Sequence, residues 1–217
     1  MDNKRNQDLA HLRENYTKSG ISDVDLPADP VPMFSRWIEE AINVEANEPN
    51  AMSLATVSED GRPNVRVVLL KGIEGNSLEF YTNYLSKKGK ELEKNPRAAV
   101  AFWWPELERQ VRIRGTVEKL SREENDEYFQ SRPRESQIGA WVSDQSTPVE
   151  SREILKEKTK SVIDRFEGRT VPTPDFWGGY SINIVEIEFW QGRPARLHDR
   201  ILYTRDKGGW KIERLQP

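Results

Sequence analysis

The spacing of hydrophobic positions changes from irregular to helical within the first fifty residues. The first thirty residues are polar and irregular and end in Leu26-Pro27-Ala28-Asp29-Pro30, so we interpret 1–30 as a flexible arm that becomes ordered only against a ligand or partner. Apolar residues then recur at helical spacing between Pro32 and Ala46, after an Asp/Pro start signal. This pattern predicts a helix over 32–46.

From Ala51 onward the hydrophobic period changes to two, which is typical of β-strands. Turn signals at Glu59-Asp60-Gly61 and Glu74-Gly75-Asn76 divide the first strands from one another. The predicted strands span 51–57, 64–73, 77–82, 98–104, 109–120, 180–190, 197–205 and 210–215. Helices are predicted over 86–95, 121–131 and 150–166, and a loop with a short helical turn over 132–148.

Short strands at hairpin spacing, interrupted by a few helices, indicate a mainly β fold of the α+β class. We expect an antiparallel barrel with peripheral helices, formed by residues 31–217 as a single domain. Alternating β-α units are absent and no G-x-G occurs, which disfavours a doubly wound nucleotide fold and a P-loop. A phosphate-bearing ligand would then be held by side chains and isolated amides.

Composition narrows the chemistry. The chain has 217 residues, no cysteine and two histidines, so disulfides, iron–sulfur clusters and thiol catalysis are excluded and no metal centre is expected. A net charge of −3 does not suggest a nucleic-acid partner. Seven Trp in a chain that is only 35% hydrophobic suggest that a second subunit completes some apolar surface. No secretory signal and no membrane-spanning run is visible, which predicts a cytoplasmic protein.

Two segments could bind phosphate groups in the first half of the chain. Arg66 lies among aliphatic residues of a strand, where a cation needs a counter-ion, either a phosphate or a carboxylate. Tyr81 and Thr82 end a strand, and Ser86-Lys87-Lys88 opens a helix whose N-terminus could bind an anion. Ordinary helix capping with surface lysines is the alternative for that second segment.

A third segment places Tyr128, Arg132 and Ser136 four residues apart. Pro133 interrupts the helix, so we expect Ser136 to come from a loop, and the three donors suit a phosphate. A helix end closed by polar residues is the alternative. Gln110, Gln145 and Ser146 could read the edge of a heterocycle, but alone they carry little information.

The C-terminal part holds Arg196, His198 and Arg200 at two-residue spacing, shortly after Trp190. In a strand these three side chains would share one face and suit an anionic planar ligand, although a solvated strand edge is the alternative. Together with the phosphate-binding segments, this wall suggests two anionic ligands side by side, such as a phosphorylated cofactor and a phosphorylated substrate. Any redox chemistry would then come from the cofactor.

Several longer motifs resemble the pyridoxine/pyridoxamine 5′-phosphate oxidase family from about His11 to Pro217. They are Arg66-Val67-Val68-Leu69-Leu70-Lys71, Phe80-Tyr81-Thr82-Asn83, Glu108-Arg109-Gln110-Val111, Tyr128-Phe129-Gln130-Ser131-Arg132-Pro133, Ser136-Gln137-Ile138-Gly139-Ala140-Trp141, Phe176-Trp177-Gly178-Gly179, Glu188-Phe189-Trp190-Gln191-Gly192 and Arg196-Leu197-His198-Asp199-Arg200.

The resemblance implies a split β-barrel homodimer with FMN at the subunit interface. It implies oxidation of pyridoxine or pyridoxamine 5′-phosphate to pyridoxal 5′-phosphate by dioxygen, with hydride transfer from substrate C4′ to the flavin, as the last step of vitamin B6 cofactor synthesis and salvage. The implied FMN contacts are Arg66, Val67, Val68, Leu69, Lys71, Tyr81, Thr82, Lys87, Lys88, Gln110, Gln145, Ser146, Trp190 and Arg200. The implied substrate contacts are Arg13, Tyr16, Lys71, Tyr128, Arg132, Ser136, Arg196 and His198, with Arg196 and His198 as catalytic residues.

One position departs from the family pattern, because the family often has Arg where this chain has Lys87. Lysine keeps the charge but loses the bidentate fork, so the resemblance is least secure there. The rival hypothesis is a non-catalytic split barrel that binds flavin or pyridoxal phosphate. A carrier of that kind needs no groups at the reacting carbon, whereas Arg196 and His198 are both present.

Overall fold

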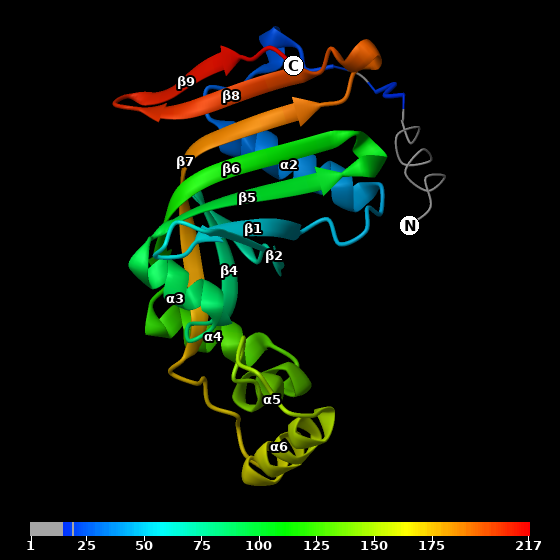
Figure 1. The fold of residues 1–217 in the computed structure, drawn as a ribbon. Coiled ribbons are helices and arrows are strands. Elements are labelled where there is room, and N and C mark those ends of the chain that lie inside the picture. Colours follow the sequence, from blue (N-terminus) through cyan, green and yellow to red (C-terminus); the bar gives the residue numbers. More distant parts are fainter. Residues whose placement is uncertain (1–14, 19) are drawn as a thin grey trace, which may run out of the picture. The chain divides into compact units, whose positions relative to one another are not determined.

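The computed structural model describes residues 15–18 and 20–217, which fall into two compact units that we treat separately (Figure 1). The described residues of the first unit are 15–18, 20–49, 102–112 and 186–217, and the second unit comprises 50–101 and 113–185. Strands β5 (Arg97–Trp104), β6 (Arg109–Lys119) and β7 (Trp177–Gln191) contribute residues to both. The boundary expected at residue 30 and the single domain after it stay predictions.

The second unit is built on an antiparallel sheet. Strand β1 (Ala51–Val57) pairs with β2 (Pro63–Leu69) and with β5, and β4 (Ser77–Asn83) pairs with β3 (Gly72–Glu74) and with β7. The strand order is β2-β1-β5-β6-β7-β4-β3. Alternate residues of β1 and β4 are buried, which is the period-two pattern seen in the sequence.

The single strand predicted over 64–73 is wrong, because the chain changes partners there. Leu70 donates its backbone N–H to the carbonyl of Asn50, next to β1, whereas Lys71 donates to Glu79 on β4. The ladder with β1 therefore ends at Leu69, and a separate strand, β3, begins at Gly72.

The second unit has four helices, and three of them follow the start signals of the sequence. The four helices are α3 (Lys87–Lys94), α4 (Arg122–Ser131), α5 (Arg134–Val142) and α6 (Arg152–Arg165). Ser86 caps α3, Ser121 forms a capping box with Glu124 on α4, and Ser151 caps α6. The predicted loop over 132–148 contains a nine-residue helix instead, so Ser136 lies in the first turn of α5 and not in a loop. Pro133 ends the previous helix, as expected, but then serves as the N-cap of the next one.

The helices α5 and α6 pack against each other around an apolar cluster (Figure 1). Its buried members are Phe129, Ile138, Val142, Phe166, Val171 and Trp177. Leu155 and Val162 of α6 pack against this cluster, whereas Ile163 is 48% exposed. The cluster therefore fixes α4, α5 and the start of β7 to one another.

The first unit contains α2 (Pro30–Asn43), β8 (Asp199–Asp206) and β9 (Gly209–Arg214), and β8 pairs with both β7 and β9. Asp29 caps α2, which starts two residues before the predicted helix. Aromatic contacts join the helix to the sheet. The ring centroids of Trp37 and Phe189 are 5.2 Å apart, and those of Phe189 and Tyr203 are 5.8 Å apart. No helix in the described part of the chain is long and apolar enough to cross a membrane.

The strand predicted from Leu197 begins only at Asp199. Ala195 and Arg196 have φ values of 55° and 61°, so the chain turns through left-handed backbone in the 3-10 segment Pro194–Arg196. Side chains alternate only along extended backbone. The prediction that Arg196, His198 and Arg200 share one strand face is therefore wrong, because only Arg200 lies on the strand.

Candidate functional site

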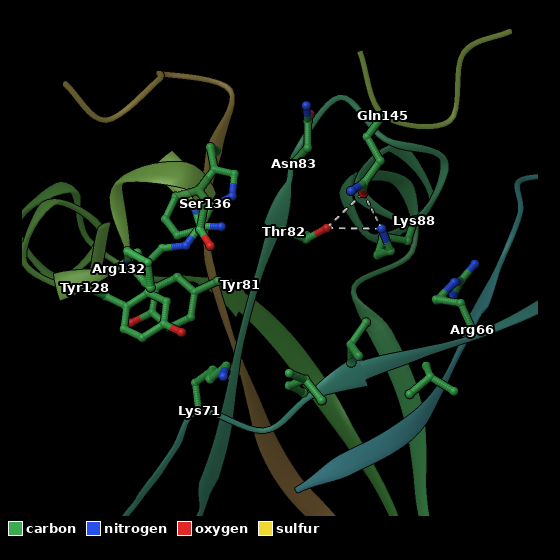
Figure 2. A pocket seen from close by; sticks show the side chains of 15 residues that line it. Arg66, Lys71, Tyr81, Thr82, Asn83, Lys88, Tyr128, Arg132, Ser136 and Gln145 are labelled. Atoms are coloured by element: carbon green, nitrogen blue, oxygen red, sulfur yellow. Dashed lines mark hydrogen bonds between the residues drawn. The ribbon is translucent and has the colours of Figure 1, made fainter. Parts of the chain in front are cut away.

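A cavity of about 510 Å³ in the second unit brings together most of the residues singled out in the sequence (Figure 2). Those that line it are Arg66, Val67, Val68, Leu69, Lys71, Tyr81, Thr82, Lys88, Tyr128, Arg132, Ser136 and Gln145. Asn83, Pro133 and Trp177 complete the wall. The polar residues form two groups on either side of β4, which we call the Lys88 cluster (Arg66, Thr82, Lys88, Gln145) and the Arg132 cluster (Lys71, Tyr128, Arg132, Ser136).

The Lys88 cluster centres on a half-buried ammonium group. Lys88 Nζ donates to Gln145 Oε1 at 2.6 Å and to Thr82 Oγ1 at 3.0 Å, and both acceptors are neutral. The pKa of Lys88 is lowered to about 8, chiefly by burial and also by the nearby Arg66, whereas Glu91 opposes the shift. An anion bound here would remove the desolvation penalty and restore the charged form of the lysine.

Arg66 is held by the sheet and by a buried carboxylate. It donates to Leu54 O at 3.1 Å and to Thr56 Oγ1 at 2.5 Å, and it lies 3.4 Å from Glu91 Oε2. Glu91, only 6% exposed, also accepts from Asn64 Nδ2 at 2.6 Å. The carboxylate counter-ion left open by the sequence is therefore present, and Arg66 still lines the cavity.

The Arg132 cluster contains a buried donor without a partner. The guanidinium of Arg132 lies 4.5 Å from the centre of the Trp177 ring and 5.5 Å from that of Phe129, and its Nη1 atom has no hydrogen-bond partner among the described residues. Burial lowers the pKa of Arg132. A buried donor of this kind is costly unless a ligand satisfies it. Tyr128 and Ser136 point toward the same space (Figure 2).

Strand β4 separates the two clusters. Tyr81 stacks on Tyr128 with ring centroids 3.8 Å apart and on Trp177 at 5.5 Å, so it faces the Arg132 cluster. Burial raises the pKa of Tyr81, and Glu79 adds to the shift, so its phenol stays protonated. The next residue, Thr82, points to the other side and contacts Lys88 (Figure 2).

Two predicted residues of the second unit lie outside the cavity wall. Lys87 donates to Asn64 Oδ1 at 2.9 Å and does not line the cavity. Ser146 is exposed, with left-handed backbone at φ 73°. Lys87, where the sequence departs from the family pattern, is thus also a residue whose side chain binds Asn64 and not the cavity.

The remaining predicted residues belong to the first unit, except Arg13, which lies outside the described residues. Trp190 and His198 pack together with ring centroids 4.5 Å apart, and Tyr16 lies edge-on to both at 5.6 Å. The backbone N–H of Arg193 donates to His198 Nδ1 at 3.1 Å. Burial lowers the pKa of His198, and the neighbouring Arg196 adds to this shift, so the neutral imidazole is favoured.

A buried carboxylate also orients Arg200. Glu188, 5% exposed, accepts from Arg200 Nε at 2.8 Å and lies 3.3 Å from Arg112 Nη1. This hydrogen bond raises the pKa of Arg200. Arg196 is exposed, and Gln110 is half-buried on β6.

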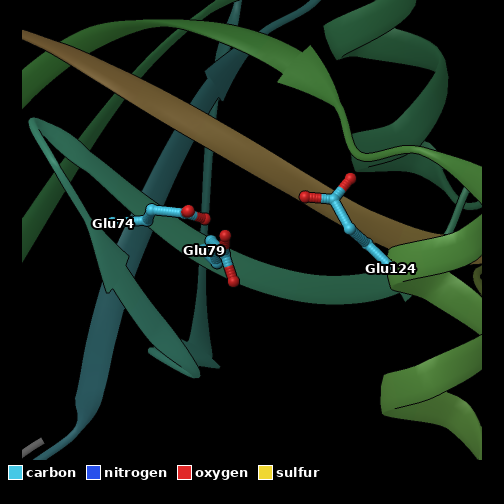
Figure 3. Close-up of side chains that lie close together, drawn as sticks. All are labelled: Glu74, Glu79 and Glu124. Carbon is cyan, nitrogen blue, oxygen red and sulfur yellow. The ribbon is translucent and has the colours of Figure 1, made fainter.

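Three carboxylates outside the cavity also lie close together, namely Glu74, Glu79 and Glu124 (Figure 3). Burial raises the pKa of Glu79, and repulsion from Glu74 and Glu124 raises it further. Exposed acidic groups often lie this close without an ion. The sequence-based expectation of no metal therefore stays a prediction.

Known sequences match this chain over nearly its whole length. A profile described as Pyridoxamine 5′-phosphate oxidase matches residues 38–166, and a second, described as Pyridoxine 5′-phosphate oxidase C-terminal dimerisation region, matches 177–217. The chain belongs to the pyridoxine/pyridoxamine 5′-phosphate oxidase family. It is therefore an enzyme of a flavin oxidoreductase family, and the second match indicates a homodimer.

Curated relatives of this oxidase family support the assignment. The pyridoxine/pyridoxamine 5′-phosphate oxidase of Rubrobacter xylanophilus is 54% identical over 97% of this chain and 97% of its own length. The protein of the same name from Nostoc punctiforme is 50% identical over 96% of this chain and 98% of its own length.

Two solved structures have the same fold. PhzG from Burkholderia lata, solved with tetrahydrophenazine-1-carboxylic acid, is 31% identical, covers 94% of this chain and 100% of its own, and has a TM-score of 0.88. An FMN-binding protein from Nostoc punctiforme is described as pyridoxamine 5′-phosphate oxidase-related and is 17% identical. It covers 89% of this chain and 99% of its own, with a TM-score of 0.70. The expected fold class is thus confirmed.

Sequence reasoning missed the buried carboxylates behind the cations of this oxidase. Glu91 follows Lys88 by three residues on α3, so a carboxylate near that lysine could have been anticipated. Its contact with Arg66 joins α3 to β2 and could not have been. Glu188 contacts Arg200 only through the pairing of β7 with β8, where Trp190 lies opposite Arg200. That register is not encoded by any local pattern.

Proposed function

We propose that this enzyme oxidises pyridoxine 5′-phosphate and pyridoxamine 5′-phosphate to pyridoxal 5′-phosphate, with FMN as cofactor and dioxygen as final acceptor. The alcohol or amine carbon loses two electrons and two protons, dioxygen becomes hydrogen peroxide, and the amine substrate also consumes water and releases ammonia. The observation that carries the proposal is the pair of cationic clusters on one cavity, because cofactor and substrate each carry a phosphate.

The Lys88 cluster fits the phosphate of FMN. It offers an ammonium group with neutral partners, a hydroxyl, an amide and the fixed guanidinium of Arg66. When bound, FMN supplies the acceptor for the hydride and passes the electrons to dioxygen. The chain's own contribution is to hold the two reacting molecules at fixed positions, which removes much of the entropic barrier.

The Arg132 cluster fits the phosphate of the substrate. The unpartnered Nη1 of Arg132 would gain its missing acceptor, and its stacking on Trp177 fixes the plane of the guanidinium. Ser136 and Tyr128 would donate hydroxyl groups, and Lys71 would add charge at the exposed edge.

His198 acts as a hydrogen-bond donor in this proposal. Because its Nδ1 accepts from the Arg193 N–H, the neutral ring carries its proton on Nε2. A ring in this state donates at Nε2 and offers no free nitrogen to take a proton. His198 therefore orients the substrate ring, while Arg196 covers the reacting face and balances the charge that develops at C4′.

The carried-over assignments of Trp190, Arg200, Gln110, Lys87, Ser146, Arg13 and Tyr16 belong to the same proposal. It also includes a homodimer with FMN at the subunit interface and a cytoplasmic location, which cell fractionation would test. The matched dimerisation region contains Trp190, Arg196, His198 and Arg200, which supports an interface site.

A simple experiment separates an oxidase from a binding module. The purified protein should be yellow, and it should bleach when pyridoxine 5′-phosphate is added without oxygen. Arg196→Ala should keep its flavin and lose turnover, whereas Arg66→Ala should lose the flavin. A yellow protein that never bleaches would support the non-catalytic alternative.

A further inference from the structure

Tyr16, in the described part of the N-terminal arm, packs against Trp190 and His198. The Tyr16 ring meets both rings edge-on at 5.6 Å, with interplanar angles of 85° and 74°. Edge-to-face contacts of this kind define both the position and the tilt of a ring. The orientation of His198 therefore depends on where Tyr16 is held.

Tyr16 rests on a glycine that cannot be enlarged. A Cβ atom at Gly192 would lie 2.7 Å from Tyr16 Cγ and 3.0 Å from Glu108 Cβ. The backbone N–H of Gly192 donates to Glu108 O at 2.8 Å, so this residue is fixed to the same loop. The absence of a side chain at Gly192 thus creates the place that the Tyr16 ring occupies.

The residues after Tyr16 are tied down by one carboxylate. Glu108 accepts from the backbone N–H of Thr17 at 2.9 Å and of Lys18 at 3.1 Å. Its own backbone is left-handed, with φ 54°, and its carbonyl also accepts from Gln191 Nε2 at 3.2 Å. A non-glycine residue in this conformation is strained, so its geometry is maintained by these contacts.

A second tie lies further along the arm. The backbone N–H of Ile21 donates to Asp199 Oδ2 at 3.1 Å, and Arg193 Nη1 donates to Lys18 O at 3.2 Å. Asp199 is also bound to Arg214, so its carboxylate serves several structural contacts. Glu108 is the cleaner residue to test, because the hydrogen bonds of its carboxylate go to the arm.

We propose that Glu108 is a positioning residue that holds Tyr16 against His198, so that the substrate meets a pre-formed wall. The proposal rests on the proposed function only for its kinetic consequence. If the arm is held for a smaller fraction of the time, the apparent affinity for substrate falls by that fraction. Turnover of the bound substrate changes little, because the substrate itself then favours the closed arm.

The test compares Glu108→Gln with Glu106→Gln in the flavin-loaded enzyme. Glu106 is an exposed carboxylate two residues away and makes no hydrogen bond or ion pair with another described residue. In Glu108→Gln we expect about tenfold higher KM for pyridoxine 5′-phosphate, which corresponds to about 1.4 kcal/mol. We expect kcat within twofold, unchanged flavin content and unchanged Tm. The Glu106 variant should match the wild type in KM, kcat, flavin content and Tm.

Amide hydrogen exchange tests the tie without reference to catalysis. The Thr17 and Lys18 amides should exchange at least fivefold faster in Glu108→Gln than in the wild type, while amides of β8 keep their rates. Unchanged exchange at Thr17 and Lys18 would overturn the proposal, as would faster exchange with an unchanged KM. Gly192→Ala should also raise KM, because its added Cβ would displace the Tyr16 ring. If the wild type lacked oxidase activity, only the kinetic part would fail.

Discussion

The state of Lys88 predicts that the cofactor binds more weakly at alkaline pH. In the free protein the pKa of this ammonium group is about 8, chiefly because the group is partly buried. Its hydrogen-bond acceptors are neutral oxygens. A bound phosphate favours the charged lysine and raises the pKa of this group. Affinity for FMN is therefore full below about pH 8 and falls as the pH rises through that value.

The size of the effect follows from the titration. With a pKa of about 8, roughly nine-tenths of Lys88 is charged at pH 7 and roughly one-tenth at pH 9. The dissociation constant of FMN should therefore rise about tenfold between these two pH values. Lys88→Arg stays charged throughout and should bind FMN with nearly the same affinity at both.

Quenching of flavin fluorescence on binding measures this constant, and riboflavin provides the matched control. Riboflavin lacks the phosphate, so its weaker binding should not change with Lys88 ionisation. The reasoning is refuted if the FMN constant is the same at pH 7 and pH 9, or if Lys88→Arg keeps the wild-type slope. A slope shared by riboflavin would show that some other group titrates.

Three further predictions concern the other parts of the molecule. Arg132→Lys should raise KM for the phosphorylated substrate about tenfold at unchanged flavin content, because lysine loses both the fork and the stacking on Trp177; an unchanged KM in steady-state assays would contradict this. Glu79→Gln should raise the free energy of unfolding at pH 7 by about 0.5 kcal/mol in urea titrations, since it removes a charge disfavoured by burial and by repulsion from Glu74 and Glu124. Because the folded pKa of Glu79 is raised, that gain should shrink as the pH falls through it, and equal gains at pH 7 and pH 4 would show that the charge of Glu79 is not the cause. Ala195→Gly should raise thermal stability slightly, by about 0.5 kcal/mol, because relief of left-handed strain exceeds the added freedom of the unfolded chain; a lower Tm would disprove that strain.

Most of the second unit could be predicted from local patterns. Period-two alternation located β1 and β4, and serine caps located the starts of α3 and α4, because these signals act over a few neighbouring residues. The donors of both clusters were also found, since cations beside hydroxyl groups are rare enough to be noticed. Their assembly on one cavity depends on the pairing of β4 with β7 and could not be derived from spacing.

The first unit shows where local reasoning fails. The R-x-H-x-R spacing suggested a strand, but Ala195 and Arg196 adopt left-handed backbone that alternation rules do not anticipate. Contacts between distant segments, such as Thr17 with Glu108, are likewise invisible without the fold. In the described part of the predicted arm, contacts with distant residues run through three carboxylates, those of Glu108, Asp199 and Asp23, and no local pattern announces them.

Strand β4 acts as a fixed spacer between the Lys88 cluster and the Arg132 cluster. Tyr81 and Thr82 serve opposite sides, and they lie opposite Gly179 and Gly178, where an added Cβ would come within 2.5 Å and 2.1 Å of neighbouring atoms. A shift of this strand by one residue would exchange the two sides, so its register cannot be altered gradually. A different distance between the two clusters would therefore have to come from α4 and α5, which carry Tyr128 and Ser136.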